Sequence, residues 1–122
     1  MASRLKQNIF GLIVFVILFT VSGVFAEDAG GGFEYDQTTI KREAAAVIIE
    51  GVMINESGET FEQANFVVTT FDFFGGQNGF GTFTIPEFSS DQPRNFQVQI
   101  NLFDNLHVDD YKIEFKGGKR KE

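Results

Sequence analysis

The one side chain suited to general acid–base chemistry near neutral pH is His107, because the chain has a single histidine and no cysteine. It lies in the acidic segment 104–110 (DNLHVDD), where a metal site or a carboxylate-assisted base would have to form. That segment has no Asp-x-Asp-x-Asp-Gly calcium-loop spacing, and neither Ser89 nor Ser90 lies in a Gly-x-Ser-x-Gly nucleophile elbow. We therefore expect a protein that is not an enzyme and has no catalytic residue, metal or cofactor.

Phenylalanine is the second residue type whose spacing bears on function. Five Phe fall within segment 71–83 (FDFFGGQNGFGTF), around a Gly-rich turn. Because side chains alternate between the two faces of a strand, Phe71, Phe73 and Phe74 cannot all enter one core. Aromatic side chains exposed near a loop tip mark a contact surface, and Phe73, Phe74 and Phe80 form the predicted one. The alternative is that all of them are buried on the two sides of a sandwich.

The first 26 residues have the features of an export signal. Arg4 and Lys6 give a positive start, Ile9–Phe19 is an unbroken apolar run, and Val24-Phe25-Ala26 precedes two acidic residues. This pattern predicts an N-terminal signal helix that is cleaved after Ala26, and a mature chain that is secreted or lies in the periplasm or cell envelope. An uncleaved membrane anchor is the alternative, since about 17 to 25 apolar residues span a membrane.

Beyond residue 26 the chain is strongly acidic. All 17 acidic residues lie there with 8 of the 10 basic ones, so the net charge falls from −7 to −9 once residues 1–26 are removed. Nucleic acid is excluded as a partner, because binding it requires a basic face. We expect residues 27–32 (EDAGGG) to be a flexible linker, residues 33–116 to be the folded domain, and residues 117–122, with Lys119-Arg120-Lys121, to be a solvated basic tail.

The part of the chain after the linker has the pattern of an all-β domain. Short runs of Val, Ile, Thr and Phe alternate with turn residues, and no apolar run has helical spacing. We expect Asp72 to cap a turn, and Asn78-Gly79 to adopt the positive φ of a tight hairpin. Strands are predicted at 45–55, 60–73, 80–88, 96–100 and 111–116, with a weaker one at 33–40. The strands 45–55 and 60–73 are expected to pair as a hairpin.

Six or so short strands predict a two-sheet antiparallel β-sandwich, because a single sheet with two apolar faces would leave one face in water. In the strand 60–73, the alternation places Ala64, Phe66, Val68 and Thr70 on one face. Twelve Phe remain after residue 26. At ~1.5 to 3 kcal/mol for each buried large apolar side chain, they can stabilise a small domain that has no disulfide.

Four motifs of the region 45–115 together resemble the FxLYD domain family. They are Gly51-x-Met53-x-Asn55, Val68-x-Thr70-Phe71-Asp72 before a Gly-rich turn, Pro93 before Phe96-x-Val98-x-Ile100, and Tyr111-x-Ile113. The chain departs from the family's naming motif, with Val68, Thr70 and Phe71 where Phe, Leu and Tyr are usual. The resemblance implies an immunoglobulin-like β-sandwich in an exported or envelope-attached prokaryotic protein, without catalytic residues.

These observations predict an exported, non-catalytic β-sandwich module that contacts an extracytoplasmic protein or serves an envelope assembly. The alternative is a carbohydrate- or calcium-binding sandwich, in which Asp104, Asp109 and Asp110 would supply oxygen ligands to the calcium ion. A membrane is expected as a partner only if the N-terminal segment stays uncleaved.

Overall fold

The computed structural model describes residues 26–43, 46–102 and 107–122. In these residues the chain forms antiparallel strands and no helix, which confirms the all-β prediction. The described part of the chain has no helix long and apolar enough to cross a membrane. The predicted signal segment lies outside the described residues, except for Ala26. The strands are β1 (Glu27–Gly30), β2 (Phe33–Glu43), β3 (Ala46–Asn55), β4 (Phe61–Phe71), β5 (Gln77–Phe88), β6 (Pro93–Leu102) and β7 (Asp110–Arg120).

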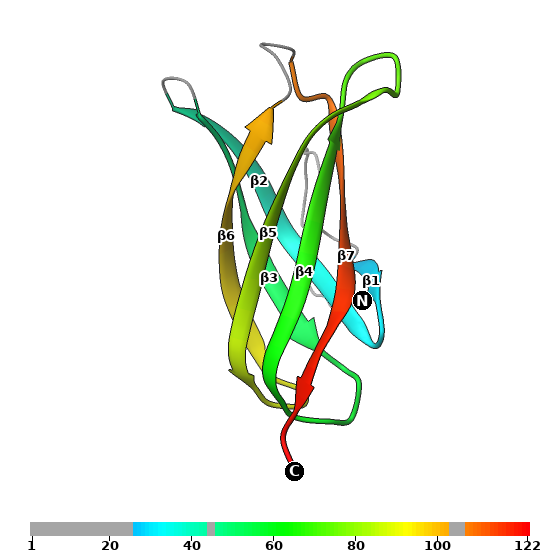
Figure 1. Ribbon diagram of the computed structural model, residues 1–122, viewed down its shortest axis with the longest axis vertical. Helices are drawn as coiled ribbons and strands as arrows, with labels where there is room; N and C mark the ends of the chain where they lie inside the picture. The colour runs from blue at the N-terminus through cyan, green and yellow to red at the C-terminus, as the bar shows by residue number, and fades with distance from the viewer. Residues whose placement is uncertain (1–25, 44–45, 103–106) are drawn as a thin grey trace, which may run out of the picture.

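The seven strands follow the order β1-β2-β3-β6-β5-β4-β7. Strands β5 and β6 share only two residue pairs, Gly79 with Leu102 and Phe80 with Asn101. This short link separates one group of strands, β1, β2, β3 and β6, from a second group, β5, β4 and β7. Figure 1 shows the second group in front of β2 and β3. The first and last strands of the order, β1 and β7, also contact each other.

Strands β3 and β4 do not form the expected hairpin. β3 pairs with β2 and β6, whereas β4 pairs with β5 and β7, so residues 56–60 connect the two groups of strands. Both strands have an apolar inner face, with Ile49 and Met53 on β3 and Phe66 and Val68 on β4, and all four side chains are buried in one core. Strands in different groups can bury these faces against each other, which neighbours in one ladder cannot do.

The core is centred on aromatic rings. Phe33, which is fully buried, has its ring centroid 5.2 Å from that of Phe66, 5.6 Å from that of Phe88 and 4.6 Å from that of Phe115. The predicted inner face of β4 is confirmed, because Ala64, Phe66, Val68 and Thr70 are all buried. The regular alternation of β6 is confirmed as well, with Phe96, Val98 and Ile100 inside.

Both ends of the folded domain extend beyond the expected boundaries. Glu27–Gly30, expected in a flexible linker, forms β1 against β2, with Ala29 buried and the Tyr35 hydroxyl donating to Glu27 Oε1 at 3.0 Å. At the other end β7 runs to Arg120 and pairs with β4 instead of becoming a free tail at residue 117. The register shifts near Gly117, whose φ is +95°, a conformation that glycine adopts without strain.

Candidate functional site

The hairpin between β4 and β5 carries the most exposed large hydrophobic side chains of the described residues. Phe73 is 78% exposed and Phe74 is 92% exposed. Their rings lie edge to face, with centroids 5.4 Å apart and an interplanar angle of 81°. The structure thus brings two of the predicted contact residues together in solvent, and we call this pair the aromatic tip.

The backbone of the hairpin is held by Asp72, which confirms the prediction that this residue caps a turn. Its Oδ1 accepts hydrogen bonds from the backbone N–H groups of Phe74 and Gly76, each at 2.9 Å. The Asp72 N–H donates to the Gly76 carbonyl at 2.8 Å, and the Gly75 N–H donates to the Asp72 carbonyl at 3.0 Å. Gly75 has a φ of +82°. These four bonds fix a tight loop that directs both aromatic rings outward.

The base of the hairpin is anchored by a buried polar network that the sequence did not reveal. Asn78, expected at a turn with positive φ, instead lies in β5 and is 2% exposed. Its Oδ1 accepts from the Thr70 hydroxyl at 2.8 Å, and its Nδ2 donates to the His107 carbonyl at 3.1 Å. The network ties β4, β5 and the segment before β7 together below the aromatic tip.

Phe80, the third predicted contact residue, lies away from the hairpin loop. It belongs to β5, opposite Thr69 on one side and Asn101 on the other, and it is 43% exposed. Its position on a paired strand differs from that of the aromatic tip.

A cleft of about 350 Å³ lies beside the aromatic tip. Its lining consists of Phe71, Asp72, Phe73, Gly75, Asp109 and Asp110. The Asp109 N–H donates to the Phe71 carbonyl at 2.8 Å, and Asp110 Oδ1 accepts from the Tyr111 N–H at 2.8 Å. Among the described residues, none of the three carboxylates of this cleft is in an ion pair. The aromatic tip therefore has a negatively charged border.

The ring of His107 lies beside a basic side chain. Its Nδ1 lies 2.8 Å from an Arg42 guanidinium nitrogen, which can only donate, so Nδ1 accepts the bond. A cation beside the ring opposes metal binding there. Within the ranges that the structure describes, no group of three His, Cys, Asp or Glu side chains could hold a metal ion. Asp104, a calcium ligand only in the alternative hypothesis, lies outside the described residues.

Asn55, which heads the glycosylation-like triplet Asn55-Glu56-Ser57, is a buried structural residue. It is fully buried, and its Nδ2 donates to the carbonyls of Glu59 at 2.8 Å and Phe88 at 3.0 Å. Its Oδ1 accepts from the Ser57 N–H at 3.0 Å. The nitrogen that would carry a glycan is thus engaged inside the fold.

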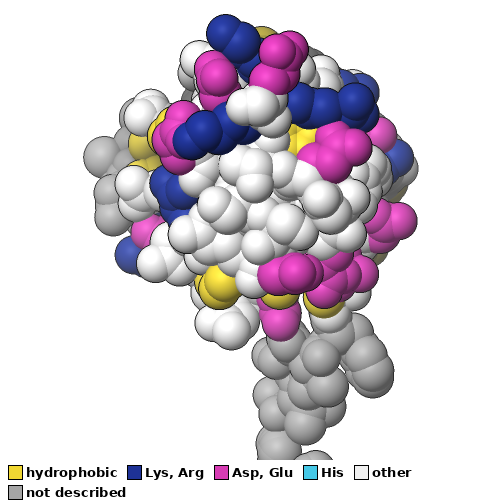
Figure 2. Space-filling model, turned by 90° about the horizontal axis from the view of Figure 1, so that it is seen from below, with side chains coloured by type: hydrophobic (Ala, Val, Ile, Leu, Met, Phe, Trp, Pro, Cys, Tyr) yellow, Lys and Arg dark blue, Asp and Glu magenta, His cyan; other side chains and the backbone are white. Residues whose placement is uncertain are grey.

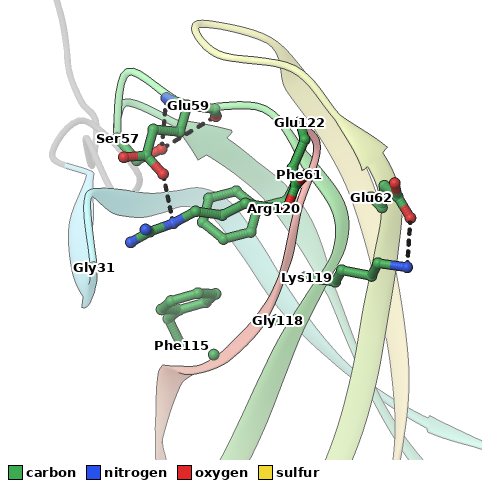
Figure 3. A pocket seen from close by; sticks show the side chains of 11 residues that line it. Gly31, Ser57, Glu59, Phe61, Glu62, Phe115, Gly118, Lys119, Arg120 and Glu122 are labelled. Carbon is green, nitrogen blue, oxygen red and sulfur yellow. Dashed lines mark hydrogen bonds and ion pairs between the residues drawn. The ribbon is translucent and has the colours of Figure 1, made fainter.

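A larger pocket, of about 880 Å³, lies at the opposite end of the molecule, between the β1–β2 turn, the β3–β4 connection and the end of β7. Figure 3 shows Phe61 and Phe115 in this pocket, with Arg120 directed to Glu59 and Lys119 directed to Glu62. Figure 2 shows the same end of the molecule, with Lys and Arg side chains interspersed among Asp and Glu. The basic groups of this pocket are paired with acids, unlike the carboxylates beside the aromatic tip.

Sequence analysis missed this pocket because its residues come from segments far apart in the chain. The local signal for it was the pair Gly117-Gly118, which interrupts the alternation of β7 just after Phe115. A Cβ atom at Gly118 would overlap the Gln63 carbonyl oxygen, so glycine there permits the close approach of β7 to β4.

Comparisons with protein-family models, with curated proteins and with solved structures found no match.

Proposed function

We propose that this chain is an exported, non-catalytic β-sandwich module that works by contacting another extracytoplasmic protein through the aromatic tip, as part of an envelope assembly. The observation that carries the proposal is that Phe73 and Phe74 are both exposed and held by a hydrogen-bonded loop. Neither ring belongs to the core, so the fold gains little from them. Exposed aromatic side chains of this kind are typical of binding surfaces.

The energetics favour a contact role. Burying one such ring against a partner stabilises a complex by ~1.5 to 3 kcal/mol relative to leaving it in water. The Asp72 bonds fix the loop before binding, so less conformational entropy is lost on association. The two adjacent rings therefore supply the central apolar anchor of an interface.

The finer fold is part of the proposal: an immunoglobulin-like two-sheet sandwich similar to FxLYD domains. The division of the strands into two groups that share only two residue pairs supports two sheets. The Gly51 of the first family-like motif supports the likeness as well, since a Cβ there would lie 2.9 Å from the Phe96 ring of the neighbouring strand. Asn55, at the end of that motif, is the last residue of β3.

The contact function is tested with Phe74→Ser in the full chain. We expect an unchanged circular dichroism spectrum together with loss of the native partner in a pull-down, because the side chain is almost entirely in solvent. Ile40→Ser, which removes an exposed apolar side chain of β2, is the matched control and should leave partner recovery intact. Undiminished recovery by a folded Phe74→Ser protein would remove the aromatic tip from the contact surface.

Export is tested separately by intact-mass analysis of the mature protein. Cleavage after Ala26 makes Glu27 the first residue, and β1 begins at that residue. A mass that still includes residues 1–26 would instead establish a retained N-terminal anchor.

A carbohydrate ligand is the second candidate function, and the pocket at the end of β7 favours it. The half-buried Phe115 ring offers an apolar face, and the carboxylates of Glu59 and Glu122 can accept hydrogen bonds from hydroxyl groups. A rise in the thermal unfolding temperature on adding glycans, lost in Phe115→Ala, would support this site. Calcium is tested in the same assay against a control of matched ionic strength.

A further inference from the structure

The border of the aromatic tip indicates what kind of surface the tip fits. We infer that the partner presents an apolar pocket bordered by Lys or Arg side chains; this inference rests on the proposed function. The first step is the composition of the cleft beside Phe73, where Asp72, Asp109 and Asp110 are the charged residues and no basic side chain is part of the lining. A complementary surface therefore needs an apolar centre for the rings and positive charge around it.

The second step is the position of the basic groups. In the described part of the chain, none of the residues of the six ion pairs lines this cleft, and four of the pairs involve the basic residues of segment 116–121. The Arg42 guanidinium is directed to His107 Nδ1. The carboxylates of the cleft are therefore not neutralised from within the fold, and their field extends over the aromatic tip.

The same charges argue against two other occupants. In a symmetric contact between two copies, the cleft carboxylates of one tip would face those of the other, which costs free energy. An anionic lipid surface would be repelled for the same reason, since the three carboxylates line the same cleft as Phe73. Apolar contact and electrostatic attraction both favour a basic protein surface as the occupant.

The size of the surface sets the expected kinetics. Each ring contributes on the order of 150 to 250 Å² of contact area, well below the roughly 800 Å² that each partner buries in a standard interface. A contact centred on this hairpin is therefore transient unless neighbouring surface joins it. In such a contact, border charges act mainly on the association rate and its salt dependence.

The experiment replaces Phe74 with the photo-reactive analogue p-benzoylphenylalanine in the full chain, expressed in the native cells. After irradiation, mass spectrometry identifies the cross-linked molecule and the cross-linked residues. The purified partner is then assayed with wild type and with Asp109→Asn/Asp110→Asn, in which the amide introduced at position 110 retains an oxygen that can accept from the Tyr111 N–H. Glu56→Gln/Asp91→Asn is the control, since it removes the same charge from exposed residues at the opposite end.

We expect a cross-link to a protein surface that contains apolar residues together with Lys or Arg. At low salt the Asp109→Asn/Asp110→Asn protein should associate roughly three- to tenfold more slowly than wild type, and the control should match wild type. The difference should vanish at high salt, where screening shortens the range of the field to a few ångströms, about 3 Å at 1 M.

The other outcomes separate the two proposals. A cross-linked protein surface without basic residues, or an unchanged association rate for the Asp109→Asn/Asp110→Asn protein, would overturn the inference about the partner and leave the contact function standing. A cross-link to lipid or to a second copy of this chain would overturn the inference and would identify that molecule as the partner of the aromatic tip. No cross-link at position 74 would contradict the proposed function itself.

Discussion

The side-chain nitrogen of Asn55, at the end of β3, lies 3.0 Å from the backbone carbonyl oxygen of Phe88, at the end of β5. The two residues belong to different groups of strands, and the bond joins them inside the protein. The backbone of Asn55 adds two contacts to the β5–β6 connection, donating to the Gln92 carbonyl at 3.4 Å and accepting from the Asp91 N–H at 2.5 Å. The side chain and the backbone of Asn55 thus join the end of β3 to the end of β5 and to the connection between β5 and β6.

Asn55→Ala should lower the free energy of unfolding by about 2 to 4 kcal/mol, because it leaves the Glu59 and Phe88 carbonyls and the Ser57 N–H without this partner. Urea denaturation measures the loss. Asn65→Ala, which removes one exposed side-chain bond to Thr84, is the control and should cost less than about 1 kcal/mol. A similar loss for both variants would contradict the central role of Asn55.

Phe66→Ala should lower the free energy of unfolding by about 3 to 5 kcal/mol, as expected for emptying an aromatic site in a packed core. The Phe66 ring is 1% exposed, stacks on Phe83 at 5.1 Å and meets Phe33 edge-on at 5.2 Å. Phe74→Ala truncates a phenylalanine that lies in solvent, and it should change the free energy of unfolding by less than about 0.5 kcal/mol. Equal denaturation midpoints for the two variants would show that the inner face of β4 is wrongly assigned.

The part of the fold that could be predicted is the part that depends on alternation. Phe66, Val98 and Ile100 are buried as expected, because each strand has to place its apolar side chains on one face whatever its partner is. Strand pairing does not follow from alternation. β3 pairs with β6 and not with β4, and this pairing depends on contacts across the core. No local pattern in either strand encodes that pairing.

The ends of the folded domain could not be predicted from the local sequence either. The segment 27–32 has the composition of a linker, yet Ala29 is buried and β1 forms, because Tyr35 and the edge of β2 provide partners for it. For the candidate site, alternation alone indicated that Phe71, Phe73 and Phe74 could not all enter one core. The Asp72 bonds, and the Asn78 network beneath them, depend on atoms that are brought together only by folding.

Gly118→Ala should destabilise the protein by about 1 to 3 kcal/mol, since the added methyl group would overlap the Gln63 carbonyl oxygen and push β7 away from β4. Lys119→Ala, at the next position, removes only an exposed ion pair to Glu62 and should cost less than about 1 kcal/mol. The comparison is made by thermal unfolding. If Gly118→Ala is as stable as wild type, residues 117–120 do not pair with β4 in solution.

The two tyrosines should ionise at higher pH in the folded protein than in the unfolded chain. Burial is the main cause that raises the pKa of both phenols above the ordinary value of 10.0, and the hydrogen bond to Glu27 raises that of Tyr35 further. The chain has 2 Tyr and no Trp, so the ultraviolet absorbance of tyrosinate reports these groups alone. Folded protein should titrate later than protein unfolded in urea.

The same shift makes stability depend on alkaline pH. Because the folded pKa of Tyr35 is raised, its contribution is fully present below the unfolded value of 10.0 and is lost as the pH rises toward the folded value, where the unfolded chain releases its proton first. Tyr35→Phe has no proton to lose, so its free energy of unfolding should fall less steeply above that pH than that of wild type. Tyr111→Phe is the matched comparison, because Tyr111 is half-buried and has no bond to Glu27. An alkaline slope for Tyr35→Phe as steep as that of wild type would show that burial and the bond to Glu27 do not raise the pKa of Tyr35.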